Sequence, residues 1–155
     1  MDACQPARDL FEKVFGEKAN LSEMVKELHK KKYYEYEGWL LAQNCKLTKE
    51  LIKVGANIHA DNDCALRLAT YYGHLEVVKL LLKNGANIHA KNDCPLRWAA
   101  ENGYLEVVKL LLKNGADIHA KNDAALHLAK YQSSLGDNSC FQVANFLKKK
   151  MKKRK

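Results

Sequence analysis

Three histidines, His59, His89 and His119, recur at an interval of thirty residues. Imidazole groups are common metal ligands and acid–base groups, so three histidines at equivalent positions suggest a metal-binding site. If each histidine belongs to a separate copy of one unit, packed helices hold the copies about 8–10 Å apart. Zinc needs its ligand atoms within about 2.0–2.3 Å of the ion. The spacing therefore favours structural, hydrogen-bonded histidines, and we expect no metal site and no cofactor.

Two cysteines, Cys64 and Cys94, recur at the same interval, which suits a small buried residue of a repeated unit better than a single nucleophile. The five cysteines include no C-x-x-C pair, so neither a disulfide framework nor a zinc knuckle is predicted. The sequence has no G-x-S-x-G motif, no phosphate-binding glycine loop and no acid–base pair distinct from the repeats. We therefore expect no catalytic residue and no enzyme activity.

The segments that position these residues form an internal repeat with a period of thirty. Residues 63–92 and 93–122 are identical at 23 of 30 positions. A degenerate copy starts at Asp123 and is interrupted by residues 133–139, and an irregular copy precedes residue 63. One unit buries too little apolar surface to be stable alone, so the units are expected to stack side by side.

Each unit is predicted to contain two short helices. Leu66, Leu68 and Ala69 mark the apolar face of the first helix, and Gly73 ends it. Residues 75–82 predict a second helix that is apolar on more than one face, as expected for a helix packed against its partner and against the next unit. Such a helix needs neighbours on both sides.

Local signals also mark the helix ends. Asp63 and Asp93 are predicted N-caps of the first helix, Pro95 falls in its first turn, and Gly85 supplies a left-handed residue after the second. Residues 6–15 and 21–31 predict one more helix pair, which brings the expected number to five. The expected organisation is an N-terminal helical capping region at 1–37, repeats at 38–147 and a basic tail at 148–155.

These segments resemble the ankyrin repeat, in which a T-P-L-H-x-A-A helix, a G-H turn, a V-V-x-L-L-L helix and a G-A-x-x-N hairpin recur about every 33 residues. The resemblance implies an all-α solenoid of stacked antiparallel helix pairs with short β-hairpin-like loops. The sequence of the repeats is also similar to the ankyrin arrays of giant amoebal DNA viruses. The matching pieces, within residues 38–147, are Pro95-Leu96-Arg97-Trp98-Ala99-Ala100, Gly73-His74, Val77-Val78-Lys79-Leu80-Leu81-Leu82 and Gly85-Ala86-Asn87-Ile88-His89.

The sequence departs from the family pattern in three ways. Three residues are missing between Ala90 and Pro95, so the hairpin should be short, with its tip at residues 91–93. Cysteine and arginine replace the threonine and histidine of T-P-L-H in the two regular copies, which removes side chains that usually bond one repeat to the next. Histidine replaces the usual hairpin asparagine. Because the family's hairpin residues are targets of asparaginyl hydroxylases, modification of His89 is an alternative role.

The seven differences between the regular copies lie mostly along the first helix and its turn. In ankyrin proteins these parts contact partners, so the resemblance implies a non-enzymatic module that binds a protein partner through its concave groove. Tyrosine and arginine are enriched at interaction hot spots and would suit an acidic or aromatic segment. The alternative is that these are tolerated surface residues, and Trp98 is expected to pack between units. The residues expected to bind the partner are Arg67, Tyr71, Tyr72, Lys91, Asn92, Arg97, Glu101, Asn102, Tyr131 and Gln132.

The formal net charge of +8 comes mainly from the C-terminus, where residues 148–155 hold seven basic residues and no acid, which leaves +1 for the rest. Lysines there suit a helix C-terminus. The alternative function is a nucleic-acid-associated or nuclear-targeted protein that acts through this tail. The residues of that import or phosphate-binding tail are Lys148, Lys149, Lys150, Lys152, Lys153, Arg154 and Lys155.

The location of the protein follows from what the sequence does not contain. No apolar run approaches the roughly 20 residues that cross a bilayer, and acidic residues interrupt the N-terminus where a signal peptide is apolar. We expect an intracellular protein, cytoplasmic or, through the basic tail, nuclear. We also expect it to be a monomer on its own, with no membrane contact and no nucleic acid except at the tail.

Overall fold

The computed structural model describes residues 22–23, 25–26, 38, 40–42 and 45–152 of the chain. Residues 22–23 and 25–26 are helical, whereas the rest of the expected N-terminal helix pair lies outside the described residues. No strand occurs in the described ranges. The longer helices are α4 (Cys45–Lys53), α5 (Ala60–Tyr71), α6 (Leu75–Lys83), α7 (Ala90–Glu101), α8 (Leu105–Lys113), α9 (Ala120–Ser134) and α10 (Asn138–Lys152).

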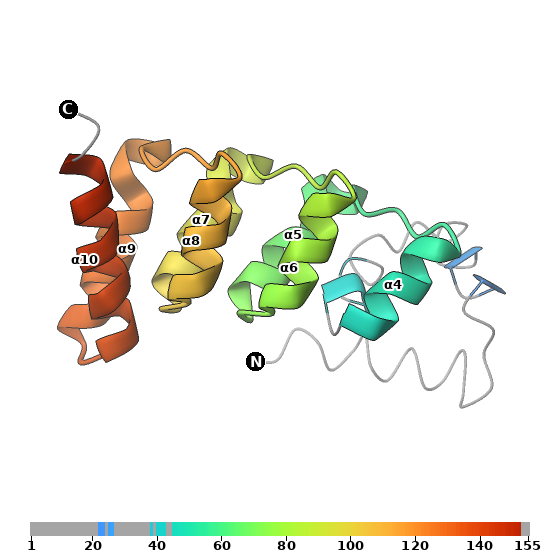
Figure 1. Cartoon of the computed structure of the whole chain (residues 1–155), viewed down its shortest axis with the longest axis horizontal. Helices are drawn as coiled ribbons and strands as arrows, with labels where there is room; N and C mark the ends of the chain where they lie inside the picture. The colour runs from blue at the N-terminus through green and yellow to red at the C-terminus, as the bar shows by residue number, and fades with distance from the viewer. Residues whose placement is uncertain (1–21, 24, 27–37, 39, 43–44, 153–155) are drawn as a thin grey trace.

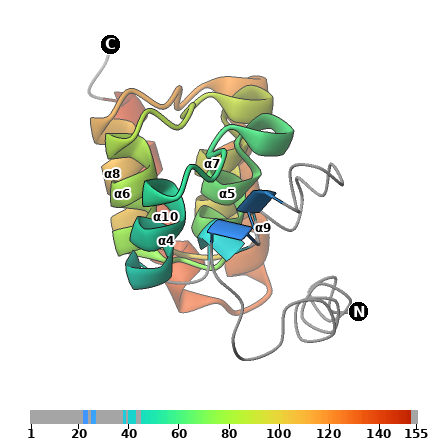
Figure 2. The ribbon, with the colours of Figure 1, turned by 90° about the vertical axis from the view of Figure 1, so that its right-hand side faces the viewer.

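The helices form antiparallel pairs that stack along the long axis of the molecule (Figure 1). Helices α5, α7 and α9 lie in one layer, and α4, α6, α8 and α10 lie in the other (Figure 2). Each helix contacts its own partner and the equivalent helices of neighbouring pairs. The predicted all-α solenoid is therefore confirmed. The described residues contain three complete pairs and α4 of an earlier pair.

The core is a row of equivalent apolar side chains shared between neighbouring pairs. Leu81, Leu111 and Leu147 occupy one position of the second helix and are all fully buried. Leu66 and Leu96 occupy one position of the first helix and are almost completely buried. Burying one such leucine stabilises the fold by about 1.5–3 kcal/mol relative to leaving it exposed. The stack is thus held together by contacts that no single unit provides.

A left-handed turn replaces the hairpin finger of each repeat. Residues 61–63, 91–93 and 121–123 all have φ between 46° and 60°, and the right-handed part of α5, α7 and α9 begins only after them. Left-handed backbone costs an L-residue about 1–2 kcal/mol, and aspartate and asparagine tolerate it best. Seven of these nine residues are Asp or Asn. The missing three residues are therefore accommodated by a tight turn, as the predicted short tip required.

The prediction that Asp63 and Asp93 cap the first helix is wrong. Each Oδ1 atom of Asp63 and Asp93 instead bonds a histidine ring and a backbone N–H of a later loop. Because Asp63 and Asp93 end a left-handed turn, their carboxylates do not face the amides of the following helix and bind elsewhere. The predicted role of Gly85 is confirmed, since it has φ +93° and the N–H of Ala86 donates to Leu81 O at 3.0 Å.

Candidate protein-binding face

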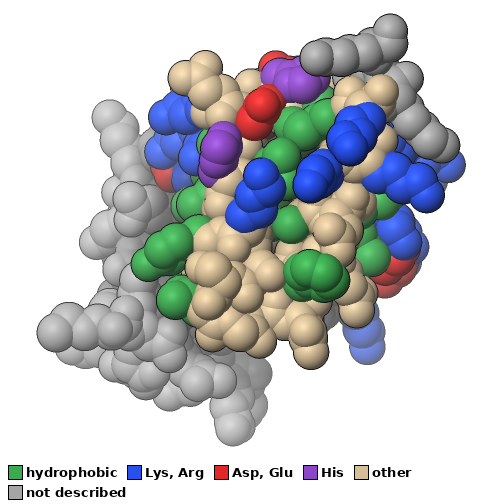
Figure 3. All heavy atoms as spheres, turned by 90° about the vertical axis from the view of Figure 1, so that its left-hand side faces the viewer, with side chains coloured by type: hydrophobic (Ala, Val, Ile, Leu, Met, Phe, Trp, Pro, Cys, Tyr) green, Lys and Arg blue, Asp and Glu red, His purple; other side chains and the backbone are tan. Residues whose placement is uncertain are grey.

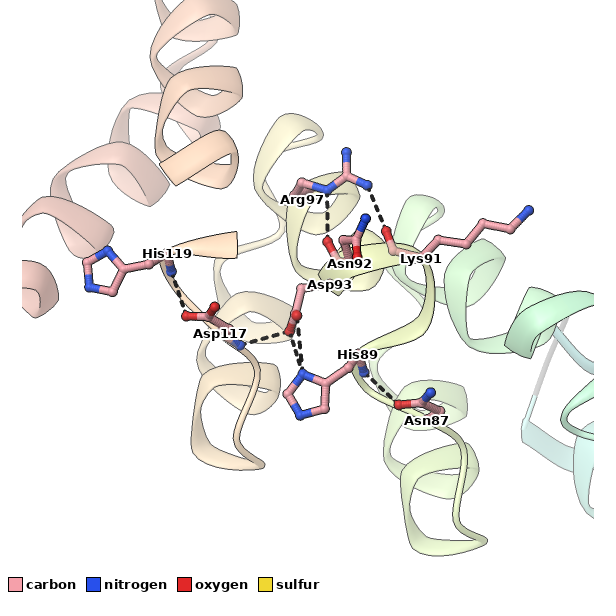
Figure 4. A network of polar contacts seen from close by, with 8 residues as sticks. All are labelled: Asn87, His89, Lys91, Asn92, Asp93, Arg97, Asp117 and His119. Carbon is pink, nitrogen blue, oxygen red and sulfur yellow. Dashed lines mark hydrogen bonds and ion pairs between the residues drawn. The ribbon is translucent and has the colours of Figure 1, made fainter. Parts of the chain in front are cut away.

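Asp63 and Asp93 each link the left-handed turn of their own helix to the loop that leads to the next turn, and Figure 4 shows the link of Asp93. Asp93 Oδ1 accepts a hydrogen bond from His89 Nδ1 at 3.1 Å and from the backbone N–H of Asp117, in the loop between α8 and α9, at 2.8 Å. Asp63 accepts equivalent bonds from His59 at 2.9 Å and from Asn87 N at 2.8 Å. Sequence reasoning missed these links between repeats. The signal was the fixed histidine-x-x-x-aspartate spacing in every copy.

The last aspartate of the series lacks this link. Asp123 bonds His119 Nδ1 at 2.7 Å, but no backbone N–H of the described residues donates to its carboxylate, and its side chain is 40% exposed compared with 7% for Asp63 and Asp93. In all three copies an ionised carboxylate can only accept, so Nδ1 carries the proton of the pair. The histidines are thus hydrogen-bonded structural residues. The described residues hold no group of three metal-ligating side chains.

The arginines of the two regular copies bind the carbonyl oxygens of the left-handed turns. Arg67 Nη2 donates to Asp61 O at 2.9 Å and to Asp61 Oδ2 at 2.8 Å, and the Arg67 side chain is 8% exposed. Arg97 donates to Asn92 O at 3.3 Å and to Lys91 O at 3.1 Å (Figure 4). The structure therefore gives Arg67 an internal role, and Arg97 keeps more of its guanidinium accessible.

An aromatic cluster joins the first helices of two neighbouring repeats. Trp98 of α7 lies edge-on to Tyr71 of α5, with ring centroids 5.4 Å apart, and Arg67 lies 5.8 Å from the Trp98 ring. Tyr71 also contacts Tyr72 at 5.1 Å, and Tyr72 contacts His74 at 6.0 Å. Trp98 is half-buried between units, as predicted. Tyr71 and Tyr72 remain 41% and 37% exposed.

The other residues expected to bind a partner are distributed along the same layer. Glu101 and Asn102 are half-buried at the end of α7, where Asn102 Nδ2 donates to Trp98 O at 2.9 Å. Tyr131 is well exposed at the end of α9, and Gln132 is half-buried beside it. Lys91 and Asn92 are exposed on the left-handed turn of α7. The structure brings Arg67 and Tyr71 together at Trp98, with Tyr72 against Tyr71, whereas Tyr131 and Gln132 belong to the last pair.

The recurring cysteines are buried, as predicted. Cys64 and Cys94 lie in the core between units. Burial raises the pKa of the Cys94 thiol, although Arg97, Arg67 and Lys91 act in the opposite direction. Burial, with the nearby Asp137 carboxylate, raises the pKa of Cys140 to about 11, and its thiol donates to Glu101 O at 3.1 Å. These thiols are poorly suited to act as nucleophiles, which require the thiolate.

The basic tail starts as part of a helix. Residues 148–152 form the C-terminal turns of α10, and residues 153–155 lie outside the described part of the chain. Figure 3 views the end of the stack that α9 and α10 form, where basic side chains gather on the upper part of the surface and hydrophobic side chains appear between them. None of the described helices is both long enough and apolar enough to span a membrane.

Stacked helix pairs, shared leucines and one recurring inter-repeat bond define a helical repeat protein. A family model described as "Ankyrin repeats (3 copies)" matches residues 18–122, which is more than half of the chain, so the chain belongs to the ankyrin-repeat family. Ankyrin-repeat proteins are typically non-enzymatic scaffolds that mediate protein–protein interactions. All but the first three residues of the last pair, α9 and α10, lie beyond the matched range, and this pair continues the stack. No curated protein matches the chain in a sequence comparison.

Proposed function

We propose that this chain binds a protein partner through the face formed by α5, α7 and α9 with their left-handed turns. The observation that carries the proposal is the cluster of Tyr71, Tyr72 and Trp98, in which exposed tyrosines are held by edge-on ring contacts across two repeats. Rings that are fixed before binding lose little side-chain entropy when a partner docks. Tyrosine, tryptophan and arginine are also the residues enriched at interaction hot spots.

The two layers of the stack differ in how much their sequences vary. Helices α6 and α8 have the identical sequence LEVVKLLLK, with the same exposed ion pair between Glu76 and Lys79 and between Glu106 and Lys109. Helices α5 and α7 differ instead at the positions of Trp98 and Tyr71, and the residue after each helix differs at the position of Tyr72. A surface that only supports the stack has no need of such differences, so the variation favours the α5, α7 and α9 layer as the specific face.

Site-directed crosslinking tests the proposal. A photoreactive amino acid is placed at Tyr71, and, as the control, at Lys79 on α6 of the opposite layer. In extract of the cell of origin, the probe at 71 should crosslink a discrete protein that excess wild-type chain competes away. Equal crosslinking from position 79, or no competed product from position 71, would show that the binding face lies elsewhere.

A second set of variants uses the repeats as their own controls. Tyr71→Glu, Tyr72→Asn and Trp98→Leu each introduce the residue found at the equivalent position of a neighbouring copy, so the fold should tolerate them. Together they should weaken binding of the crosslinked protein by about 10- to 100-fold, the range expected on losing hot-spot side chains. Full affinity in a folded triple variant would reject the aromatic cluster as the anchor.

The alternative function rests on the basic tail. Lys148, Lys149 and Lys150 are exposed on α10, and cations at a helix C-terminus are favourable without any partner. If the tail binds nucleic acid, the affinity should fall steeply as ionic strength rises, and binding should be lost on deletion of residues 148–155. Binding through the aromatic cluster should survive both changes. A reporter fused to residues 148–155 that stays in the cytoplasm would reject nuclear import.

A further inference from the structure

The turn of α5 holds a carboxylate between two cations. Asp61 Oδ2 lies 2.8 Å from Arg67 Nη2, and Asp61 Oδ1 lies 4.0 Å from Nζ of Lys91, which belongs to the next turn. The Asp61 carboxylate therefore lies between two cationic side chains, those of Arg67 and Lys91. The Asp61 side chain is 33% exposed, so this carboxylate sits at the surface beside the aromatic cluster.

The turn of α7 has the same backbone but carries a lysine at the position of Asp61. Lys91 has φ 49° and ψ 49°, close to the 46° and 55° of Asp61, and Lys121 has 51° and 51°. The equivalent group of three is Arg97, Lys91 and Lys121, all cations. Arg97 donates to the carbonyl oxygens of Lys91 and Asn92, and no carboxylate of the described ranges forms an ion pair with Arg97 or Lys121.

We propose that Arg97 binds a carboxylate side chain of the partner, at the position that the Asp61 carboxylate takes beside Arg67. The proposal rests on the proposed function and specifies its partner, an acidic segment. The chain itself shows that this backbone accommodates a carboxylate against a turn-bound guanidinium. Charge-assisted bonds between guanidinium and carboxylate are among the stronger polar contacts of proteins. Arg97 is adjacent to Trp98 in the chain, so the acidic group would dock beside the aromatic anchor.

Two acidic residues of α7 lie near Arg97: the buried Asp93 and, at the end of the helix, Glu101. Glu101 lies one helical turn after Arg97, and its charge acts on the Cys94 thiol together with those of Arg97, Arg67 and Lys91. No ion pair joins Glu101 to Arg97 in the described part of the chain. Asp93 bonds His89 and the Asp117 N–H, and Asp61 bonds Arg67, so neither of these carboxylates occupies Arg97.

Exchange of one residue between the two turns tests the proposal. Lys91→Asp gives the turn of α7 a carboxylate at the position of Asp61 and should fill the site internally. Asp61→Lys removes the carboxylate that pairs with Arg67 and should open a second site there. Lys83→Asp, which makes the same change of charge as Lys91→Asp but on the exposed end of α6, is the control. Circular dichroism and thermal unfolding check that each variant folds.

The probe is a hexaglutamate peptide, titrated into the isotope-labelled full-length chain and followed by two-dimensional nitrogen–proton NMR. The wild type should show saturable shifts at Arg97 Nε–H and at the amides of residues 91–93. Lys91→Asp should weaken that binding at least about fivefold, which corresponds to about 1 kcal/mol of lost ion pairing. Lys83→Asp should leave it unchanged, and Asp61→Lys should add shifts at Arg67 Nε–H.

Three results would overturn the proposal. Shifts confined to residues 148–152 would assign acidic binding to the tail. Equal affinity in the wild type and in Lys91→Asp would show that Arg97 does not hold a carboxylate. Inorganic phosphate that produces the same shifts at lower concentration would make the site a phosphate site. If any of these occurs while crosslinking from Tyr71 persists, the carboxylate assignment fails and the proposed function stands.

Discussion

Asp93, in the left-handed turn of α7, accepts a hydrogen bond at 2.8 Å from the backbone N–H of Asp117, in the loop that leads to α9. This bond joins one helix pair to the entry of the next pair, and the Asp93 side chain is 7% exposed. The same carboxylate also holds His89, so one side chain fixes both its own turn and the loop before the next turn. Side chains of this kind join the units, in addition to the leucines of the core.

The first prediction concerns this link. Asp93→Ala leaves the Asp117 N–H and the His89 ring without their acceptor. The His89 ring is 56% exposed and can bond water instead, so the cost comes mainly from the part-buried bond to the Asp117 N–H. We expect a loss of about 1–3 kcal/mol in the free energy of unfolding, measured by urea denaturation. Asp123→Ala is the matched control, because among the described residues Asp123 bonds His119 alone, and it is more exposed. Equal losses in the two variants would show that the inter-repeat bond adds no stability.

A second prediction concerns the close approach of α10 to the turn after α7. A Cβ on Gly103 would lie 2.6 Å from Ser139 Cβ and 3.1 Å from the backbone nitrogen of Cys140, whereas a Cβ on Gly115 would have no atom within 4 Å. Both glycines have positive φ, so both alanine variants carry backbone strain of about 1 kcal/mol. Only Gly103→Ala must also displace α10. The midpoint of thermal unfolding should therefore fall further in Gly103→Ala than in Gly115→Ala. Similar midpoints in the two variants would contradict the close packing of α10 against Gly103.

A third prediction concerns pH and the start of α10. Backbone N–H groups of Cys140 and Ser139 bond the Asp137 carboxylate and hold its pKa below the ordinary 3.8. A carboxyl group whose pKa is lower in the folded state stabilises the fold above its unfolded pKa, and this contribution is lost as the pH falls through the folded pKa. The stability difference between wild type and Asp137→Asn should therefore shrink below about pH 4. A constant difference between about pH 3 and 6, measured by urea denaturation, would reject the cap.

A fourth prediction concerns thiol reactivity. Cys94 and Cys140 are buried with raised pKa values, whereas Cys45 is half-buried. Labelling by a disulfide reagent at neutral pH should modify Cys45 well before Cys94 or Cys140, because the thiolate is the reactive species. Mass spectrometry of the peptides gives the order, and urea should abolish the difference. Fast labelling of Cys94 in the folded chain would contradict its place in the core.

The stacking could be predicted from the sequence because the spacing of leucines such as Leu66 and Leu81 directly reports which faces are buried. The roles of Asp63 and Arg67 could not. Both depend on a left-handed turn, and neither helical nor strand periodicity encodes such a turn. Once the chain turns at residues 61–63, Arg67 reaches the Asp61 carboxylate six residues earlier, and Asp63 points away from its own helix. Tertiary geometry, not local propensity, determines the hydrogen-bonding roles of these two polar residues.

The same limit applies to the binding face. The tyrosines could be found from the differences between the copies, since their exposure follows from their place at the end of the first helix. The contact between Tyr71 and Trp98 depends on the distance between neighbouring units, which the sequence does not contain. Asp61 was missed for the same reason. Its signal was an acid in one copy where the other two copies have Lys91 and Lys121.

Hydrogen–deuterium exchange with and without the protein captured through position 71 tests the central claim most directly. If the partner docks on the aromatic cluster, the amides at the C-terminal ends of α5 and α7, around Tyr71, Tyr72 and Trp98, should exchange more slowly in the complex. Amides of α6 and α8 should keep their rates. Protection confined to α6, α8 or the end of α10, with none around Tyr71 and Trp98, would contradict the account.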